Sequence, residues 1–276
     1  NPIESELRNR IGWLWDDIEW NWFIRDGRDV LYWHWSPNNG WSMNFPLRGY
    51  NECLITYILA ASAERYPVSA EVYHRGWAQS DFFRNGKTFF GYTLPLGFDY
   101  GGPLFFTHYS YLGLDPHGLK DSYADYWEQN RNHTLIPRAY CLAPPPKYKG
   151  YGEDCWGLTA SDNPRGYAAH SPTEDLGVIT PTAALSAFPY TPEYSMQALK
   201  HFYYDLGNKI WGSYGFADAF SETDNWVAKS YLAIDEGPIV VMIENYRTGL
   251  LWKLFMSCPE IHNGLRKLGF ESPYLK

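Results

Sequence analysis

The chain alternates between segments with helical hydrophobic spacing and long stretches rich in glycine, proline and aromatic residues. In residues 52–63, Leu54, Ile55, Ile58 and Leu59 recur at intervals of three and four, as on one face of a helix. No regular alternation of strands with crossover helices is visible, so a parallel α/β sheet is not expected. The pattern favours a mainly α fold whose paired helices carry long loops, gathered at one end.

Similar spacing, with proline and capping signals, predicts most of the remaining helices. They are expected over 2–24, 67–83, 121–142, 180–187, 193–206, 236–255 with a break at Gly249, and 259–268. Asp121 is the expected N-cap of its helix. Residues 30–35 read as a strand or extended piece, 89–106 as a hairpin or long loop, and 143–165 as a long irregular stretch.

This helix order fits an α/α toroid, a closed ring of helical hairpins with a cleft at one mouth. About eight or nine helices are expected, whereas a complete six-hairpin ring has twelve. We therefore expect residues 1–276 to form a single domain that lacks N-terminal hairpins and is the C-terminal part of a longer protein. The start at Asn1, without Met or a signal peptide, fits the same expectation.

Charge and hydropathy argue against two classes of partner. The 276 residues carry a net charge of -8, and the pI is near 5.5. A nucleic-acid backbone binds to a basic surface stripe, and none is visible. The apolar run at residues 239–243 is too short to span a bilayer. We expect no nucleic acid partner and no membrane span.

Four cysteines are present, at positions 53, 141, 155 and 258. None forms a Cys-x-x-Cys pair, so neither a zinc site nor any other metal or cofactor is expected. Two disulfides are an alternative in an oxidising compartment. Free, buried thiols are the favoured interpretation.

Aromatic residues make up 18% of the chain, and many stand beside Gly, Pro, Asn or Asp in predicted loops. Trp156 lies between Cys155 and Gly157, and Trp226 follows Asp224-Asn225. A flat ring covers the C–H face of a sugar, while nearby carboxylates and amides bind its hydroxyls. The composition therefore indicates a carbohydrate site.

Glycoside hydrolysis requires two carboxyl groups flanking the scissile bond, one protonated and one ionised. Glu52 stands at the entry of an apolar helix, where the alternative is a capping carboxylate. Asp235 and Glu236 precede a second apolar helix, where the alternative is a cap plus a solvated neighbour. These acids are the candidates for the reaction.

Two further clusters carry polar groups suited to sugar hydroxyls. Asp162 and Tyr167 lie in the loop 159–167, which also reads as an Asx-turn region. Arg247 lies in an apolar helix, where pairing with Glu244 three residues earlier is the alternative to a cleft position.

Several long motifs, spread over most of the chain, match one known family. They are residues 156–162 (WGLTASD), 180–184 (TPTAA), 214–220 (YGFADAF), 234–240 (IDEGPIV) and 243–249 (IENYRTG). These resemble the bacterial glucoamylase-like domain. Residues 33–37 (WHWSP) and 49–52 (GYNE) are similar to the Bacteroidetes endo-β-1,2-glucanases of that group.

The resemblance implies an (α/α)6 barrel that hydrolyses β-1,2-glucan to sophorooligosaccharides with inversion at the anomeric carbon. It also implies a periplasmic or secreted protein, and we expect a monomer. By similarity, Glu52 is the general acid and Asp235 the general base, with Glu236 as the alternative base. The implied sugar-binding residues are Trp156, Asp162, Tyr167, Trp226, Glu236 and Arg247.

The chain departs from the family pattern at one motif. Asp235 is followed by Glu236 where Asp-Gln-Gly-Pro is the common form, and an added carboxylate perturbs the pKa of its neighbour. Two alternatives stay open: the related domain of cyclic β-1,2-glucan synthases, and a non-catalytic glycan-binding module.

Overall fold

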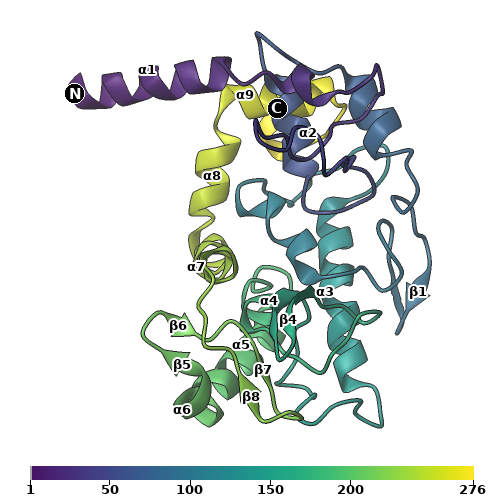
Figure 1. Ribbon diagram of the computed structural model, residues 1–276, viewed down its shortest axis with the longest axis vertical. Coiled ribbons are helices and arrows are strands. Elements are labelled where there is room, and N and C mark those ends of the chain that lie inside the picture. The colour runs from purple at the N-terminus through teal and green to yellow at the C-terminus, as the bar shows by residue number, and fades with distance from the viewer. Residues whose placement is uncertain (1) are drawn as a thin grey trace.

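The computed structural model describes residues 2–276, and the fold is mainly helical (Figure 1). The α-helices are α1 (Pro2–Asp16), α2 (Leu54–Ser62), α3 (Tyr126–Leu142), α4 (Pro181–Leu185), α5 (Pro192–Lys200), α6 (Gly207–Ile210), α7 (Ala233–Thr248), α8 (Leu250–Met256) and α9 (Pro259–Lys267). Short 3-10 helices are η1 (Trp20–Phe23), η3 (Leu104–Thr107), η4 (Ser110–Leu112) and η6 (Pro273–Leu275), and π-helical turns are η2 (Val72–Trp77) and η5 (His201–Asp205).

Short antiparallel hairpins complete the secondary structure. They are β1 (Thr88–Phe89) with β2 (Tyr92–Thr93), β3 (Ala160–Asn163) with β4 (Gly166–Ala169), β5 (Trp211–Gly212) with β6 (Gly215–Phe216), and β7 (Phe220–Ser221) with β8 (Trp226–Val227). Within residues 2–276 the named strands form no parallel pairs, as the absence of strand–helix alternation predicts.

The helices predicted over 52–63, 180–187 and 259–268 are confirmed as α2, α4 and α9. The predicted break at Gly249 is also confirmed, because this residue adopts the left-handed conformation (φ +67°) between α7 and α8. A residue with a side chain is strained there, so glycine ends one helix and lets the next begin.

Three expectations need correction. The helix expected over 2–24 stops at Asp16, and the helix expected over 67–83 is only a short turn around η2. The N-cap of α3 is Asp125, whose carboxylate accepts hydrogen bonds from the amides of Trp127 and Glu128. Asp121 instead accepts from the amides of Tyr123 and Ala124, because the chain makes a separate turn before the helix.

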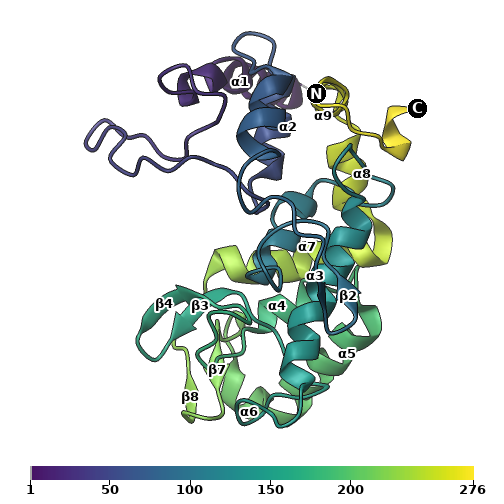
Figure 2. The same ribbon diagram turned by 90° about the vertical axis from the view of Figure 1, so that its right-hand side faces the viewer.

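The core of the molecule has two main parts, which we call the first and second lobes (Figure 2). The first lobe packs α2, η2 and α9 around buried residues such as Tyr57, Trp77 and Leu265. The second packs α4, α5 and the β5–β8 hairpins around Trp156, Phe202 and neighbours. Helix α3 spans both, since Tyr126 at its start lies in the first core and Cys141 near its end in the second.

In the first lobe, α2 and α9 come from distant parts of the chain and touch closely. A Cβ on Gly264 would lie only 2.3 Å from the carbonyl oxygen of Ile58, so the approach requires glycine. Asn263 and Lys267 of α9 donate to the carbonyls of Ser62 and Ala61 at 3.1 and 3.0 Å. These bonds satisfy carbonyl groups that the end of α2 leaves without helical partners.

A chain of buried polar groups runs from the first lobe to Tyr190. The hydroxyls of Tyr50 and Tyr111 are 2.8 Å apart, and Tyr50 also donates to Asn130 at 2.9 Å. The Asn130 amide donates to the Tyr190 hydroxyl, which donates to the carbonyl of Thr107. Because buried polar groups are costly without partners, this continuous chain fixes the relative position of its members.

Helix α1 and the cysteines are the remaining features of the fold. Helix α1 projects from the first lobe and has no buried residue, although Ile3, Leu7, Ile11 and Leu14 form an apolar stripe along it (Figure 1). Among residues 2–276 no helix combines the length and apolarity needed to cross a membrane. All four cysteines are free thiols, as predicted, but only Cys141 and Cys155 are buried.

Candidate active site

Asp162 and Asp218 are held together at the base of two hairpins. Asp218 accepts a hydrogen bond from the backbone amide of Asp162 at 2.7 Å. Its own amide donates to the carbonyl of Ser230, and the Ser230 hydroxyl donates to the Asp162 carboxylate. Strands β3 and β7 therefore bring two acids into contact that are far apart in the sequence.

Asp235 lies in the first turn of α7, beside these acids. The Thr182 hydroxyl of α4 donates to its backbone carbonyl at 2.5 Å, and the Tyr109 hydroxyl donates to its carboxylate at 3.3 Å. The side chain is buried, with the residue only 1% exposed. Packing of α4 against α7 thus explains why the TPTAA motif accompanies the acid.

The Asp218 and Asp235 carboxyl groups lie close enough to perturb the pKa of each other. Both residues are buried, and one oxygen of each receives no hydrogen bond from any other described group. Burial and mutual repulsion raise the pKa of Asp235 to about 7, and burial raises that of Asp218. Two such carboxyls satisfy each other by sharing one proton.

Glu236 adds a third acid to this group. Burial, followed by the charges of Asp218 and Asp235, raises its pKa to about 7. Its position at the start of a helix acts in the opposite sense, since a helix N-terminus stabilises a carboxylate by about 0.3–1 kcal/mol. Burial and repulsion outweigh that contribution.

Glu52 lies on the first-lobe side, in the turn just before α2. Its backbone carbonyl accepts a hydrogen bond from the Ser110 hydroxyl, which in turn accepts from the amide of Ile55. Burial raises the pKa of the Glu52 carboxyl, and hydrogen bonding to its own backbone lowers that pKa less. A raised pKa keeps a carboxyl group protonated nearer neutral pH.

The pKa of Tyr109 is affected by acids from both sides of the site. Burial raises the pKa of its hydroxyl, and the negative charges of Asp235 and Glu52 raise it further. Tyr167 pairs with Asp162 across the β3–β4 hairpin, and it also raises the pKa of Tyr109. Burial and the charge of Asp235 raise the pKa of Tyr167 itself to about 12. Acids from both lobes therefore face one group of tyrosines.

A cavity of about 680 Å³ adjoins this neighbourhood. Phe105 lines it and stacks on Tyr109 at a centroid distance of 5.2 Å, while Ala169 at the end of β4 lines its other side. Phe98, Arg84 and other aromatic and polar residues complete the wall. Such a lining suits a sugar, which presents C–H faces and hydroxyl groups.

Two of the residues expected to bind sugar do not join the acids. Trp156 is 0% exposed in the second core, so its ring cannot stack on a ligand, which corrects the prediction. Trp226 is half-buried on β8 and pairs with Ser221, three residues beyond Asp218 along the strand direction. That spacing separates it from the acids by about 10 Å.

Arg247 lies at the opposite end of α7 from Asp235. The twelve-residue separation corresponds to about 18 Å along the helix axis. Its side chain is 67% exposed and forms an ion pair with Glu244 at 3.3 Å, the alternative that the sequence left open. The structure thus brings together Glu52, Asp162, Tyr167, Asp235 and Glu236, and leaves Arg247 outside.

Asp218, Tyr109 and Ser230 complete the site, and the last two were not among the residues selected from sequence. Asp218 stands within the YGFADAF motif, so the motif contained a signal for it. Tyr109 and Ser230 lie outside the matched motifs, and their roles depend on contacts between distant segments. Only the folded chain reveals them.

Comparison with known proteins now defines the class. The family model described as "Putative glucoamylase" matches residues 44–259, and the chain belongs to this glucoamylase-like family. A curated relative, the exo beta-1,2-glucooligosaccharide sophorohydrolase (non-reducing end) of Parabacteroides distasonis, is 45% identical over 97% of this chain and 40% of its own length.

Solved structures support the same relationship. The endo-beta-1,2-glucanase from Chitinophaga pinensis, in complex with sophorotriose and glucose, is 62% identical, with a TM-score of 0.95 over 100% of this chain and 67% of its own. A "putative glucoamylase" from Bacteroides uniformis is 63% identical, with a TM-score of 0.97 and the same coverage. The chain thus spans about two fifths of the curated relative and two thirds of these structures.

Proposed function

We propose that this chain is the catalytic part of an inverting glycoside hydrolase that cleaves β-1,2-glucan to sophorooligosaccharides. One observation carries the proposal: the adjacent residues Tyr109 and Ser110 contact both acids, since the Tyr109 hydroxyl donates to the Asp235 carboxylate and the Ser110 hydroxyl donates to the backbone carbonyl of Glu52. Two carboxyl groups on either side of a shared space are what the reaction needs. The sequence identity of 45% and 62% to relatives named for β-1,2-glucan cleavage supports the β-1,2 linkage as the one that is cleaved.

Glu52 is proposed as the general acid. Its carboxyl group is removed from water and has a raised pKa, so it holds the proton that the glycosidic oxygen must receive. Proton transfer lets the leaving sugar depart as an alcohol, while the Glu52 carboxylate remains behind. No second acidic residue contributes to its raised pKa.

Asp235 is proposed as the general base. In its ionised form it takes a proton from a water molecule, whose oxygen attacks the anomeric carbon from the face opposite the leaving group. Asp218 tunes this step through its charge, because together with burial it raises the pKa of Asp235 to about 7, so that Asp235 becomes ionised near neutral pH. Glu236 is the alternative base, with Asp162 and Tyr167 as partners for the sugar hydroxyls.

Endo cleavage is the favoured mode, because the 62% identical relative is an endo-enzyme. Removal of sophorose from the non-reducing end is the second candidate, since the 45% identical relative is an exo-enzyme. We also propose the (α/α)6 barrel and a periplasmic or secreted monomer, as the family resemblance implies. The exposed apolar stripe of α1 supports a single domain whose barrel is completed by sequence beyond this chain.

The decisive experiment incubates the purified protein with linear β-1,2-glucan, β-1,3-glucan and α-1,4-glucan and resolves the products. We expect hydrolysis of β-1,2-glucan alone, with a series of oligosaccharides for endo cleavage and only the disaccharide for exo cleavage. Hydrolysis of another glucan in preference would contradict the proposed substrate.

A variant then tests the assignment of the acid. Glu52→Gln should lower β-1,2-glucan hydrolysis by about 10²–10⁴-fold while glucan affinity survives, because the amide cannot donate the acidic proton. Glu193→Gln, a change at an exposed residue of α5, is the matched control and should leave the rate unchanged. Equal rates for the two variants would rule out Glu52 as the acid.

A further inference from the structure

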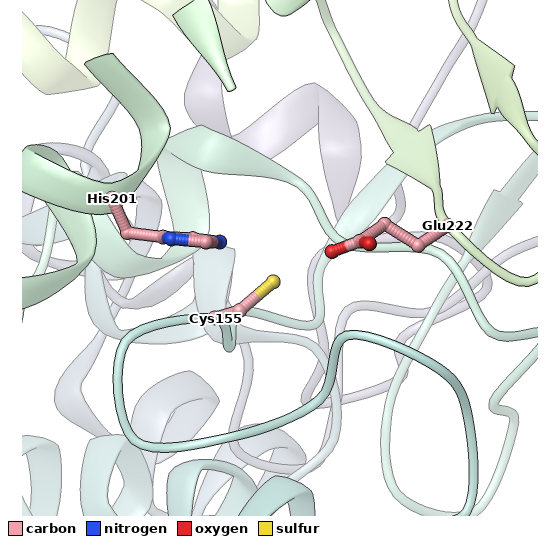
Figure 3. A group of neighbouring side chains, drawn as sticks. All are labelled: Cys155, His201 and Glu222. Atoms are coloured by element: carbon pink, nitrogen blue, oxygen red, sulfur yellow. The ribbon is translucent and has the colours of Figure 1, made fainter. Parts of the chain in front are cut away.

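A second group of reactive side chains lies in the second lobe, outside the carboxylate site. It consists of Cys155 from the loop after α3, His201 at the start of η5 and Glu222 from the turn after β7. Their Sγ, imidazole nitrogen and carboxylate oxygen all lie within 4.8 Å of one another. Figure 3 shows the imidazole and the carboxylate pointing toward each other from opposite sides, with the thiol between them.

The hydrogen bonding of His201 leaves one nitrogen available. Nδ1 lies 3.0 Å from the carboxylate of Asp205 and 3.8 Å from that of Asp154, so it carries the proton and donates. Nε2 is buried and has no hydrogen-bond partner among the described residues. A buried lone pair without a donor is costly, and here it points into the space between the thiol and the carboxylate.

We propose that Cys155 Sγ, His201 Nε2 and the Glu222 carboxylate bind a Zn²⁺ ion. A thiolate, an imidazole and a carboxylate are the three ligand types that zinc accepts together. The Asp205–His201 pair reproduces the arrangement in which a carboxylate orients a zinc-bound histidine. Cys155 binds as its thiolate, and its proton passes to solvent.

The geometry needs a modest adjustment. Tetrahedral zinc places its sulfur, nitrogen and oxygen ligands about 3.3–3.5 Å from one another, so ligand atoms that lie within 4.8 Å close by up to about 1.5 Å. Glu222 is held in place on one side, since a Cβ on Gly150 would lie 2.4 Å from its Oε1. Cys155 is 1% exposed and therefore also fixed by packing.

An ion has a route to this position. A surface cavity of about 390 Å³ is lined by His201, by Lys200 and by the three acids Glu153, Asp154 and Asp205, so the charge of its lining is net negative. These negative charges favour entry of a cation, and a water molecule in the cavity supplies the fourth ligand.

The ion would join three segments that no covalent bond connects, namely the loop around Cys155, the α5–η5 junction and the β7–β8 turn. Glu222 follows β7 only four residues after Asp218, which belongs to the carboxylate site. We therefore assign zinc a structural role that fixes the hairpin carrying Asp218. Ligands this far apart in sequence lack the Cys-x-x-Cys spacing, which explains why the cysteine pattern predicts no metal.

The test measures zinc binding to the full chain. The protein is stripped with a chelator, checked for its helical circular dichroism, and dialysed against zinc or against Mg²⁺ and Ca²⁺ as controls. We expect one zinc per chain by elemental analysis, and a near-ultraviolet thiolate-to-metal absorption band when Co²⁺ replaces zinc. A folded, stripped protein that takes up no zinc would overturn the proposal.

Variants locate the site. Glu222→Gln and His201→Gln should lose stoichiometric zinc and the rise in Tm of about 5 °C or more expected at zinc a hundredfold above Kd. Asp205→Asn should weaken binding by about 10-fold or more. Cys258→Ser removes a thiol outside the cluster and should bind as the wild type does. If folded Glu222→Gln and His201→Gln keep wild-type zinc stoichiometry and affinity, the assigned ligands are wrong.

Discussion

Glu52 and Asp235 both have raised pKa values, but their surroundings raise them in different ways. Burial acts on Glu52 without a contribution from another acid. Asp235 is buried too, yet Asp218 and Asp162 add repulsion and a shared proton. The pKa of a buried carboxyl without acidic neighbours depends mainly on its burial. The pKa of a carboxyl beside other acids also depends on the charge of each of those acids. The first arrangement suits a proton donor, and the second suits a base whose charge state must be set.

The largest expected effect comes from removing the crowded acid. Asp235→Asn should lower hydrolysis by about 10²–10⁴-fold, because no carboxylate then accepts the proton of the attacking water. Comparison of its turnover rate with that of Glu52→Gln measures whether the two sides contribute equally. A residual rate near that of the wild type would move the base assignment to Glu236.

The same variant also changes stability, with a definite sign. Asp235 has a folded-state pKa of about 7, above its unfolded value near 4, so the native state binds more protons between these pH values. Wild-type stability therefore falls as pH rises from about 4 to about 7. Thermal melts should show Asp235→Asn gaining Tm relative to the wild type between pH 5 and pH 8, and a constant difference would contradict the raised pKa.

A smaller effect is expected from Asp218→Asn, which keeps the shape of the pair and removes one charge. Without that repulsion the pKa of Asp235 should fall, so the acidic limb of the kcat/KM profile should move from about pH 7 to lower pH by about one unit. Glu193→Gln is the charge-matched control and should leave the limb in place. A shift of the acidic limb to higher pH would show that Asp218 does not raise the pKa of Asp235.

Tyr109→Phe should shift the same limb in the opposite direction and by less. The Tyr109 hydroxyl donates to Asp235 and lowers its pKa, but the 3.3 Å bond is long and its contribution small. We expect the limb to rise by less than one pH unit and the rate at pH 7 to fall about threefold. An unchanged pH profile of kcat/KM would show that the hydroxyl does not act on the base.

The smallest effect is expected at Arg247, at the far end of α7. Arg247→Ala removes an exposed ion pair with Glu244, and such pairs are worth about 0–1 kcal/mol. KM and kcat for β-1,2-glucan should stay within about twofold of the wild type. A tenfold rise in KM would restore this residue to the sugar-binding set.

The site was predictable from sequence wherever a motif and a local element coincide. Glu52 and Asp235 each stand at the entry of a helix that hydrophobic spacing reveals. Trp156 and Arg247 show the limit, because motif membership does not distinguish a residue that packs the core from one that meets a ligand. Asp218 gains its role from a contact with Asp162 across distant segments, which no local pattern encodes.

The fold shows the same division. Helices with regular apolar spacing, such as α2 and α9, were predicted closely. The β3–β4 hairpin was not, because its Ser161-Asp162-Asn163 sequence is polar and lacks the β-branched residues typical of strands. Its strands form through pairing with each other and through the contact of Asp162 with Asp218.

The close contact of α2 with α9 has a consequence for the order of assembly. Helix α2 is synthesised before the second lobe, whereas Gly264, which lets the two helices touch, is synthesised after it. The second lobe lies almost wholly between them in sequence and has its own core. During translation the residues of the second lobe are therefore complete first, and α2, with Glu52 at its entry, is fixed in place only when α9 packs against it.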